Sequence, residues 1–201
     1  MSVDHYFSQT PDNEFKPKEI QVSLAGRSVT VQTSGGIFSP EHVDQGTAVL
    51  LSHLEDAPAS GNILDIGCGW GPIAIALALA SPKSTVWSID INERSLELTR
   101  RNVASLHLEN VRVCKPEEIP AGLEFSGIWS NPPIRVGKDQ LHAILKLWLP
   151  RLAKHGEAFF VVQKNLGADS LAKWMSSEFQ ELRTDRVDTQ KGFRVLKSRW
   201  N

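Results

Sequence analysis

Three short segments of the chain hold residues that could bind a charged ligand and position a reacting group. The first is residues 65–72, DIGCGWGP, in which Gly67, Gly69 and Gly71 alternate with other residues. Glycines lack a Cβ atom, so the backbone can turn sharply there and a ligand can approach it closely. The spacing is G-x-G-x-G, which differs from the G-x-G-x-x-G of dinucleotide sites.

Asp65 indicates which ligand suits this glycine loop. A carboxylate there would repel a pyrophosphate by roughly 4 kcal/mol for unit charges 4 Å apart at a surface-like dielectric. It favours a cationic ligand, and S-adenosylmethionine carries an ammonium and a sulfonium group and no phosphate. Taken alone, the loop is equally compatible with a structural turn between a strand and a helix. Cys68, between two glycines, fits a small buried residue better than a nucleophile.

The second segment centres on Asp90, which lies 19 residues beyond Gly71. An acid about 20 residues after a glycine loop is placed to accept hydrogen bonds from both hydroxyls of a ribose. We expect Ile91, the next residue, to line the same site. Asp90 or Asn92 could instead cap the helix that follows, although a cap at Asn92 does not exclude a ribose role for Asp90.

The third segment is Asn131-Pro132-Pro133-Ile134. Its prolines fix φ and restrict the residue before them, so Asn131 is held stiffly. The Asn131 side-chain oxygen and the Pro132 carbonyl are two acceptors that can converge on one NH₂ group. This suits methyl transfer to a conjugated amino nitrogen, for which positioning can contribute about 7–11 kcal/mol. The alternative is a turn that merely ends a strand.

The elements around these segments alternate between short apolar runs and helical patterns, which predicts βαβ units and a mostly parallel sheet. Ligands bind such sheets beyond the carboxyl ends of the strands, where all three segments fall. We predict strands at 62–66, 85–89, 111–114, 125–129, 157–162, 182–187 and 193–196, and helices at 72–80, 92–106, 138–153 and 169–179. Before them, the sequence predicts a hairpin of strands 19–24 and 28–33 and a helix from Asp44 to about Glu55.

Composition excludes several classes of protein. Of 201 residues, 41% are hydrophobic and 22% charged, which excludes a disordered chain and a coiled coil. Two cysteines are too few for a disulfide framework, so we expect a cytoplasmic protein. The most apolar stretch is interrupted by Asp65, glycines and Pro72, so we expect no membrane span. The six histidines lack metal-ligand spacing, so we expect no metal.

Charge is unevenly distributed along the chain. Residues 1–130 hold 9 Lys and Arg against 16 Asp and Glu, whereas residues 131–201 hold 13 against 7. The basic C-terminal part could face a phosphate backbone. Solvated lysines without a partner would give the same count.

In this order, the three segments resemble class I S-adenosylmethionine-dependent methyltransferases. Over about residues 4–198 the chain is similar to the small methyltransferase domain of the bacterial 16S rRNA guanine-N2 methyltransferase family. Further matching segments are 4–8, 36–39, 44–47, 90–92, 130–138, 164–168 and 191–195. The resemblance implies a single active copy of a domain that other family members pair with a degenerate copy.

The family implies a Rossmann-like seven-stranded, mostly parallel sheet with helices on both faces and an N-terminal β-hairpin. We expect one structural domain, with residues 1–60 packed on a core of residues 61–201. By resemblance Asp65, Gly67, Gly69 and Gly71 hold the methionine end of the cofactor, Asp90 its ribose, Asn131 to Ile134 the target amine, and Phe38 and Ser39 wall the site. Arg135 and Lys138 are the expected phosphate contacts to rRNA.

Two departures from the family pattern affect the site. Lys115 stands where an acid commonly meets the adenine amino group, which Glu117 or Glu118 could replace. Ile134 is not aromatic and cannot stack a base taken out of its helix, so we expect Phe193 or Phe38 to supply the ring. Two other functions stay open: N-methylation of a protein glutamine amide or a small-molecule amine, and a non-catalytic RNA-binding factor.

Overall fold

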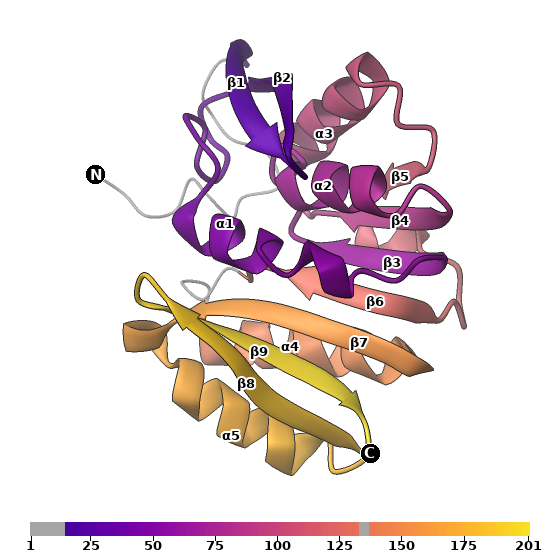
Figure 1. The fold of residues 1–201 in the computed structure, drawn as a ribbon, viewed down its shortest axis with the longest axis vertical. Coiled ribbons are helices and arrows are strands. Elements are labelled where there is room, and N and C mark those ends of the chain that lie inside the picture. Colours follow the sequence, from indigo (N-terminus) through magenta and orange to yellow (C-terminus); the bar gives the residue numbers. More distant parts are fainter. Residues whose placement is uncertain (1–14, 133–136) are drawn as a thin grey trace.

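A seven-stranded sheet forms the centre of the molecule (Figure 1), as the sequence predicts. The computed structural model describes residues 15–132 and 137–201. The strand order is β5-β4-β3-β6-β7-β9-β8, in which β3 to β7 run parallel and β9 runs antiparallel to β7 and β8. The strands are β3 (Gly61–Ile66), β4 (Ser84–Ile89), β5 (Val111–Cys114), β6 (Phe125–Ser130), β7 (Leu152–Gln163), β8 (Leu182–Gln190) and β9 (Phe193–Trp200).

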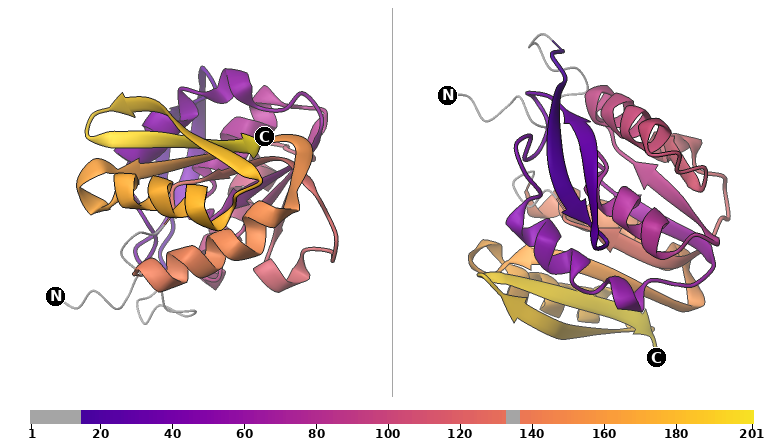
Figure 2. Two further views of the ribbon diagram at one scale, coloured as in Figure 1. Left: turned by 90° about the horizontal axis from the view of Figure 1, so that it is seen from below. Right: turned by 45° about the horizontal axis from the view of Figure 1, so that its top comes forward.

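Helices cover both faces of this sheet (Figure 2). They are α1 (Gln45–Leu51), α2 (Pro72–Ala80), α3 (Glu93–Ser105), α4 (Lys138–Trp148) and α5 (Ala168–Glu178). Successive strand residues point to opposite faces. Phe159 of β7 therefore packs in the cluster with α1, α2 and α3, and Phe160 packs in the cluster with α4 and α5.

An antiparallel hairpin of β1 (Lys18–Leu24) and β2 (Arg27–Thr33) packs beside α2 and α3, which confirms the predicted N-terminal extension. The buried side chain of Asn102 holds the hairpin against α3. Nδ2 of Asn102 donates to the carbonyl oxygens of Gln32 at 2.9 Å and Trp70 at 2.8 Å, and Oδ1 of Asn102 accepts from Gln32 N at 2.6 Å. Buried amides need such partners, so the hairpin is tied to α3 and to the glycine loop together.

Some predicted boundaries were wrong. The helix predicted over 138–153 ends at Trp148, because Pro150 lacks the N–H that would continue it. Strand β7 then begins at Leu152, and Gly156 lies within it because a Cβ there would meet the Phe125 carbonyl oxygen at 2.8 Å.

The helix predicted to reach Glu55 ends at Leu51, where a short 3-10 turn follows at Leu54–Asp56. The hydroxyl of Ser52 donates to the Val49 carbonyl at 2.7 Å, and this kind of local bond competes with further helical bonds. The last two strands extend to residues 190 and 200, further than the apolar pattern alone predicts.

Neither a membrane-spanning helix nor a cluster of metal ligands occurs among the described residues. No helix among residues 15–132 and 137–201 has both the length and the apolar character needed to cross a membrane. In the same ranges, no three His, Cys, Asp or Glu side chains gather in a way that could hold a metal ion.

Candidate active site

The three chemically distinctive segments meet at the carboxyl ends of β3, β4 and β6. The strand order reverses at β3, the position where ligands bind such sheets. Backbone N–H groups of Gly67 and Cys68 both donate to the Ile89 carbonyl, at 2.9 and 3.0 Å, which joins the first segment to the second. Ser130 Oγ donates to the Ile66 carbonyl at 2.8 Å, which joins the third to the first.

Two of the three loop glycines face open space. Gly67, Gly69 and Gly71 have φ values of 82°, 58° and 93°, in the region that favours glycine. A Cβ atom on Gly67 or Gly69 would meet nothing within 4 Å, whereas one on Gly71 would lie 3.0 Å from Thr99 Cγ2. The first two glycines therefore leave room for a ligand, and the third lets α3 approach.

Cys68 lies within this loop but is buried, and the Thr99 hydroxyl lies 3.3 Å from its sulfur. Burial raises the pKa of the Cys68 thiol well above its usual value. Cys68 is thus a small buried residue, as the sequence predicts, and a thiol with a raised pKa is a weak nucleophile.

Asp65 is fully buried beneath the loop. Its Oδ2 accepts from Ser88 Oγ at 3.1 Å, and hydrogen bonding to Ser88 and to the backbone of Ala74 lowers the pKa of Asp65. Burial, with a smaller contribution from the charge of Asp90, outweighs these bonds and raises the pKa of Asp65 to about 7. A cationic ligand would favour the ionised form. This arrangement fits the ammonium group of S-adenosylmethionine.

Asp90 holds the loop with both oxygens. Oδ2 accepts from Gly69 N at 3.1 Å and Oδ1 from Asn92 N at 2.9 Å, and burial raises the pKa of this carboxyl. The side chain of Ser95 and the backbone of Ile91 also hydrogen-bond this carboxyl. A carboxylate has about four acceptor positions, so a ribose hydroxyl would share them with these donors. Asn92 caps α3 through its side chain, which accepts from Arg94 N at 2.9 Å. Ile91 is 53% exposed beside Asp90, which leaves its side chain available to a ligand.

Asn131 is oriented by the first turn of α1. Its Nδ2 donates to Asp44 Oδ2 at 2.8 Å and to Thr47 Oγ1 at 3.0 Å. A carboxylate only accepts hydrogen bonds, so the Asn131 amide nitrogen faces Asp44 and Oδ1 faces the other way. The sequence identified Asp44 only as a helix cap, which it is, since Oδ2 also accepts from Thr47 N at 3.1 Å.

Thr47 and the second role of Asp44 were missed from the sequence. The only available signal was that residues 44–47 belong to a segment that resembles the family. Nothing in the local pattern predicts a contact between residues 87 positions apart.

One small pocket gathers the glycine loop, Asn131 and the start of α1. Phe38 and Ser39, the predicted wall residues, are part of it. Its lining residues are Phe38, Ser39, Asp44, Thr47, Gly67, Cys68, Gly69, Trp70, Pro72, Ile73 and Asn131. Phe38 is 50% exposed, and the Ser39 carbonyl accepts from Trp70 Nε1 at 3.1 Å, which holds the wall against the loop.

Other predicted residues lie elsewhere or outside the described ranges. Phe193 is the first residue of β9, and its ring packs against Gly46 of α1. A Cβ atom added to Gly46 would lie only 2.8 and 2.9 Å from two carbons of this ring. Lys138 is exposed at the first residue of α4, and Pro132 is buried. Pro133, Ile134, Arg135 and the segment 4–8 lie outside the described residues.

Lys115 has partners away from the pocket. It forms an ion pair with Glu93, and its backbone N–H donates to Glu118 Oε2 at 2.6 Å. Hydrogen bonding to Glu93 raises the pKa of Lys115. Of the two acids that could meet the adenine amino group, Glu118 is thus already engaged with the backbone.

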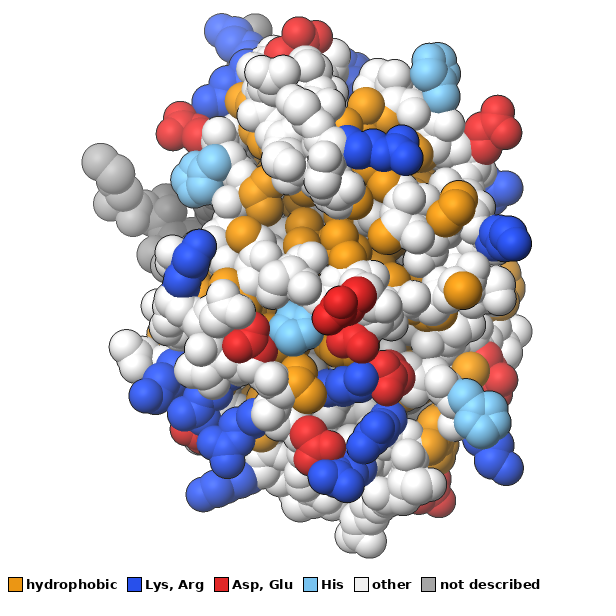
Figure 3. Space-filling view, in the orientation of Figure 1, with side chains coloured by type: hydrophobic (Ala, Val, Ile, Leu, Met, Phe, Trp, Pro, Cys, Tyr) orange, Lys and Arg blue, Asp and Glu red, His pale blue; other side chains and the backbone are white. Residues whose placement is uncertain are grey.

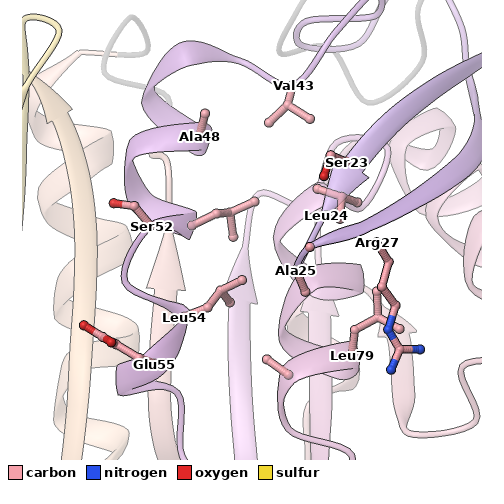
Figure 4. Close-up of a pocket in the computed structure, with 13 residues that line it drawn as sticks. Ser23, Leu24, Ala25, Arg27, Val43, Ala48, Ser52, Leu54, Glu55 and Leu79 are labelled. Carbon is pink, nitrogen blue, oxygen red and sulfur yellow. The ribbon is translucent and has the colours of Figure 1, made fainter.

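A second cavity, of about 620 Å³, lies between α1 and the hairpin turn (Figure 4). Ala48, Ser52 and Leu54 line one side of it, and the hairpin turn and Leu79 of α2 line the other. It contains no residue of the three segments.

Comparison with known proteins agrees with this arrangement. The family model described as methyltransferase small domain matches residues 28–197. The protein YbxB of Bacillus subtilis (strain 168), itself named uncharacterized, is 32% identical over 199 residues, 98% of each chain. Ribosomal RNA small subunit methyltransferase C of Shewanella sp. (strain MR-4) is 34% identical over 136 residues, which are 68% of this chain and 39% of that protein.

A solved structure shares the fold. The Thermus thermophilus 16S rRNA N2 G1207 methyltransferase RsmC, in complex with AdoMet and guanosine, superposes with a TM-score of 0.80 at 21% identity, over 95% of this chain and 52% of that one. The chain thus spans 39% and 52% of the lengths of these two enzymes. The chain belongs to the methyltransferase small domain family.

Proposed function

We propose that the protein transfers a methyl group to the exocyclic N2 amine of a guanine in 16S rRNA. The observation that carries the proposal is the orientation of Asn131. Asp44 and Thr47 hold its amide nitrogen, so its Oδ1 is left to accept a hydrogen bond from an incoming amine beside the open glycine loop.

The residues of the chain have separate tasks in this reaction. Asp65 binds the ammonium group of the cofactor, and Asp90 binds the ribose while it holds Gly69. The bound cofactor supplies an electrophilic methyl group on sulfur. Asn131 Oδ1 and the Pro132 carbonyl accept the two N–H bonds of the amine, which aims the nitrogen lone pair at the methyl. The proton is lost to water after transfer, so no strong base is needed.

A guanine in RNA must leave its stack to reach this pocket, and the extruded ring needs a surface to stack on. Phe38 is the better placed of the two predicted rings, because it is half exposed and lines the same pocket as Asn131. Phe193 packs on Gly46 instead. We therefore assign base stacking to Phe38.

The choice of guanine in rRNA over other amines rests on two observations. Relatives over 68% of the chain are named as small-subunit rRNA methyltransferases, and the superposed structure holds guanosine. The C-terminal part of the chain is also basic, as a polyanionic substrate requires. A glutamine amide offers the same NH₂ group, so methylation of a protein is the second candidate.

The test is to incubate the protein with methyl-tritiated S-adenosylmethionine and either free 16S rRNA or assembled small subunits, then identify the labelled nucleoside by mass spectrometry. The proposal expects label in N2-methylguanosine. Label in another nucleoside, or in glutamine of a ribosomal protein, would contradict it. Binding of RNA without any transfer would favour a non-catalytic factor.

A further inference from the structure

Two segments that the reaction does not use meet beside the active site. Residues 164–167 follow the end of β7, and residues 191–194 span the turn into β9. They are joined where Lys164 N donates to the Gly192 carbonyl at 2.8 Å, just beyond the last pair of the ladder, Gln163 and Phe193. We call residues 164–167 and 191–194 the β7–β9 wall.

The wall stands next to Asn131. Ser130, the last residue of β6, pairs with Phe160, so β7 continues three residues further. At about 3.3 Å per residue this places the wall roughly 10 Å beyond the end of β6, one or two strand spacings to the side. In Figure 1 the turn between β8 and β9 lies at the same side of the molecule as the end of β6.

Cations without partners project from the wall. Lys164 and Lys191 are exposed, and neither forms an ion pair within the described residues. The nearby acids are already engaged: Asp169 pairs with both Arg186 and Arg194, and Asp188 lies 3.3 Å from His53 Nε2. Figure 3 shows Lys and Arg side chains gathered over this part of the molecule, at its lower left.

Carboxyl groups lie at the other half of the same sheet edge. Asp65, which is buried, and Asp90, which is half-buried, lie beside the glycine loop, at the ends of β3 and β4. Exposed cations thus lie over β7 and β9, and buried or half-buried acids lie over β3 and β4. Leu166, 46% exposed beside Lys164, adds an apolar surface next to the exposed cations.

We propose that the β7–β9 wall binds the RNA strand that flanks the extruded guanine, with Lys164 and Lys191 on phosphates and Leu166 against a neighbouring base. The inference rests on the proposed function, since it places the flanking nucleotides of the same substrate. An RNA strand fits better than an acidic protein surface because it carries a regular series of phosphates on both sides of any extruded base.

The experiment compares two double variants of the full chain, K164A/K191A and K83A/K154A. Lys83 and Lys154 are also exposed and have no ion pair among the described residues, but they lie at the amino ends of β4 and β7, the opposite edge. Both variants lose the same charge. Affinity for a short fluorescein-labelled single-stranded RNA is measured by anisotropy over a range of salt concentrations, with thermal melting and cofactor affinity as checks on folding.

We expect K164A/K191A to bind the RNA on the order of tenfold more weakly than the wild type. The plot of log association constant against log salt concentration should become less steep by about 1.4, because two phosphate contacts to a single strand are lost. K83A/K154A should bind like the wild type.

Equal affinities and slopes for the two variants would overturn the inference. Polyglutamate serves as a probe for an acidic protein partner. If K164A/K191A loses binding to polyglutamate but binds RNA like the wild type, the inference is overturned and the wall is assigned to an acidic protein. If the wild-type protein itself binds no RNA, the proposed RNA substrate fails rather than the wall alone.

Discussion

The side-chain nitrogen of Asn131 lies 2.8 Å from Oδ2 of Asp44, the residue that also caps α1. One carboxylate therefore caps a helix and fixes the orientation of the amide to which we assign the substrate amine. The segment that contains Asn131 and the start of α1 thus form one unit, although 87 residues separate Asn131 from Asp44 in the chain.

Thr47→Val tests this unit without disturbing the cap. The change keeps the side-chain volume but removes the hydroxyl that accepts from Asn131 at 3.0 Å. A single hydrogen bond contributes about 0.5–1.5 kcal/mol, so we expect kcat to fall about 2- to 13-fold with little change in KM. Steady-state methyl transfer measures this, and Ser52→Ala, at the opposite end of α1, is the control. An unchanged kcat in Thr47→Val would show that Asn131 does not need the hydroxyl.

Asp44→Ala should have the larger effect. It removes the other partner of Asn131 and costs about 1 kcal/mol of stability through loss of the helix cap. We expect a drop in kcat greater than that of Thr47→Val and a lower melting temperature. Asp44→Asn, which can still cap the helix, should recover the melting temperature more fully than kcat. Equal recovery of both would indicate that Asp44 acts only through folding.

Asp65 and Asp90 should be distinguished by a truncated ligand. Methylthioadenosine keeps the adenine and ribose of the cofactor but lacks the amino-acid part. Asp65→Asn should weaken S-adenosylmethionine binding about 10- to 150-fold, as expected for a lost charged hydrogen bond of 1.5–3 kcal/mol, and leave methylthioadenosine binding unchanged. Asp90→Asn should weaken both ligands. Calorimetry measures all four affinities, and a loss of methylthioadenosine binding in Asp65→Asn would refute the assignment.

The raised pKa of Asp65 predicts a pH-dependent stability. Its pKa is about 7 in the folded protein against an ordinary value of 3.8, so between these values the folded state binds the proton more strongly than the unfolded state. The free energy of unfolding therefore falls as pH rises from about 4 to about 7 and levels off above that range. Denaturant titrations should show that Asp65→Asn reduces this decline. A wild-type protein that gains stability over the same range relative to the variant would contradict the burial of this carboxyl.

Substitutions at two glycines of the loop should affect cofactor affinity and protein stability to different extents. Gly67→Ala adds a methyl group that meets no protein atom but projects into the space left for the cofactor, whereas in Gly71→Ala the methyl group meets Thr99 at 3.0 Å. Both changes strain a positive φ, at a cost of about 1–3 kcal/mol. We expect Gly67→Ala to lose more cofactor affinity and Gly71→Ala to lose more stability. The reverse order, in melting and binding measured together, would place the cofactor elsewhere.

The sequence predicted the sheet, the hairpin and the three segments at the strand ends, because apolar periodicity and glycine or proline punctuation are local. It did not predict the contact of Asn131 with Asp44 and Thr47, which exists only once α1 packs beside β7 and the end of β6. The true start of β7 was missed for a related reason. The polar stretch around Lys154 and His155 gives no strand signal, and Gly156 acts as a close-packing residue against β6 rather than as a stop.

The most direct test of the account is single-turnover methyl transfer from prebound S-adenosylmethionine to small-subunit RNA by the wild type and by Asn131→Ala. The cofactor contacts that we propose for Asp65 and Asp90 do not involve the Asn131 side chain, so the variant should bind the cofactor with nearly wild-type affinity and form no N2-methylguanosine. Formation of that nucleoside by Asn131→Ala at the wild-type rate would contradict the claim that this amide presents the amine to the methyl group.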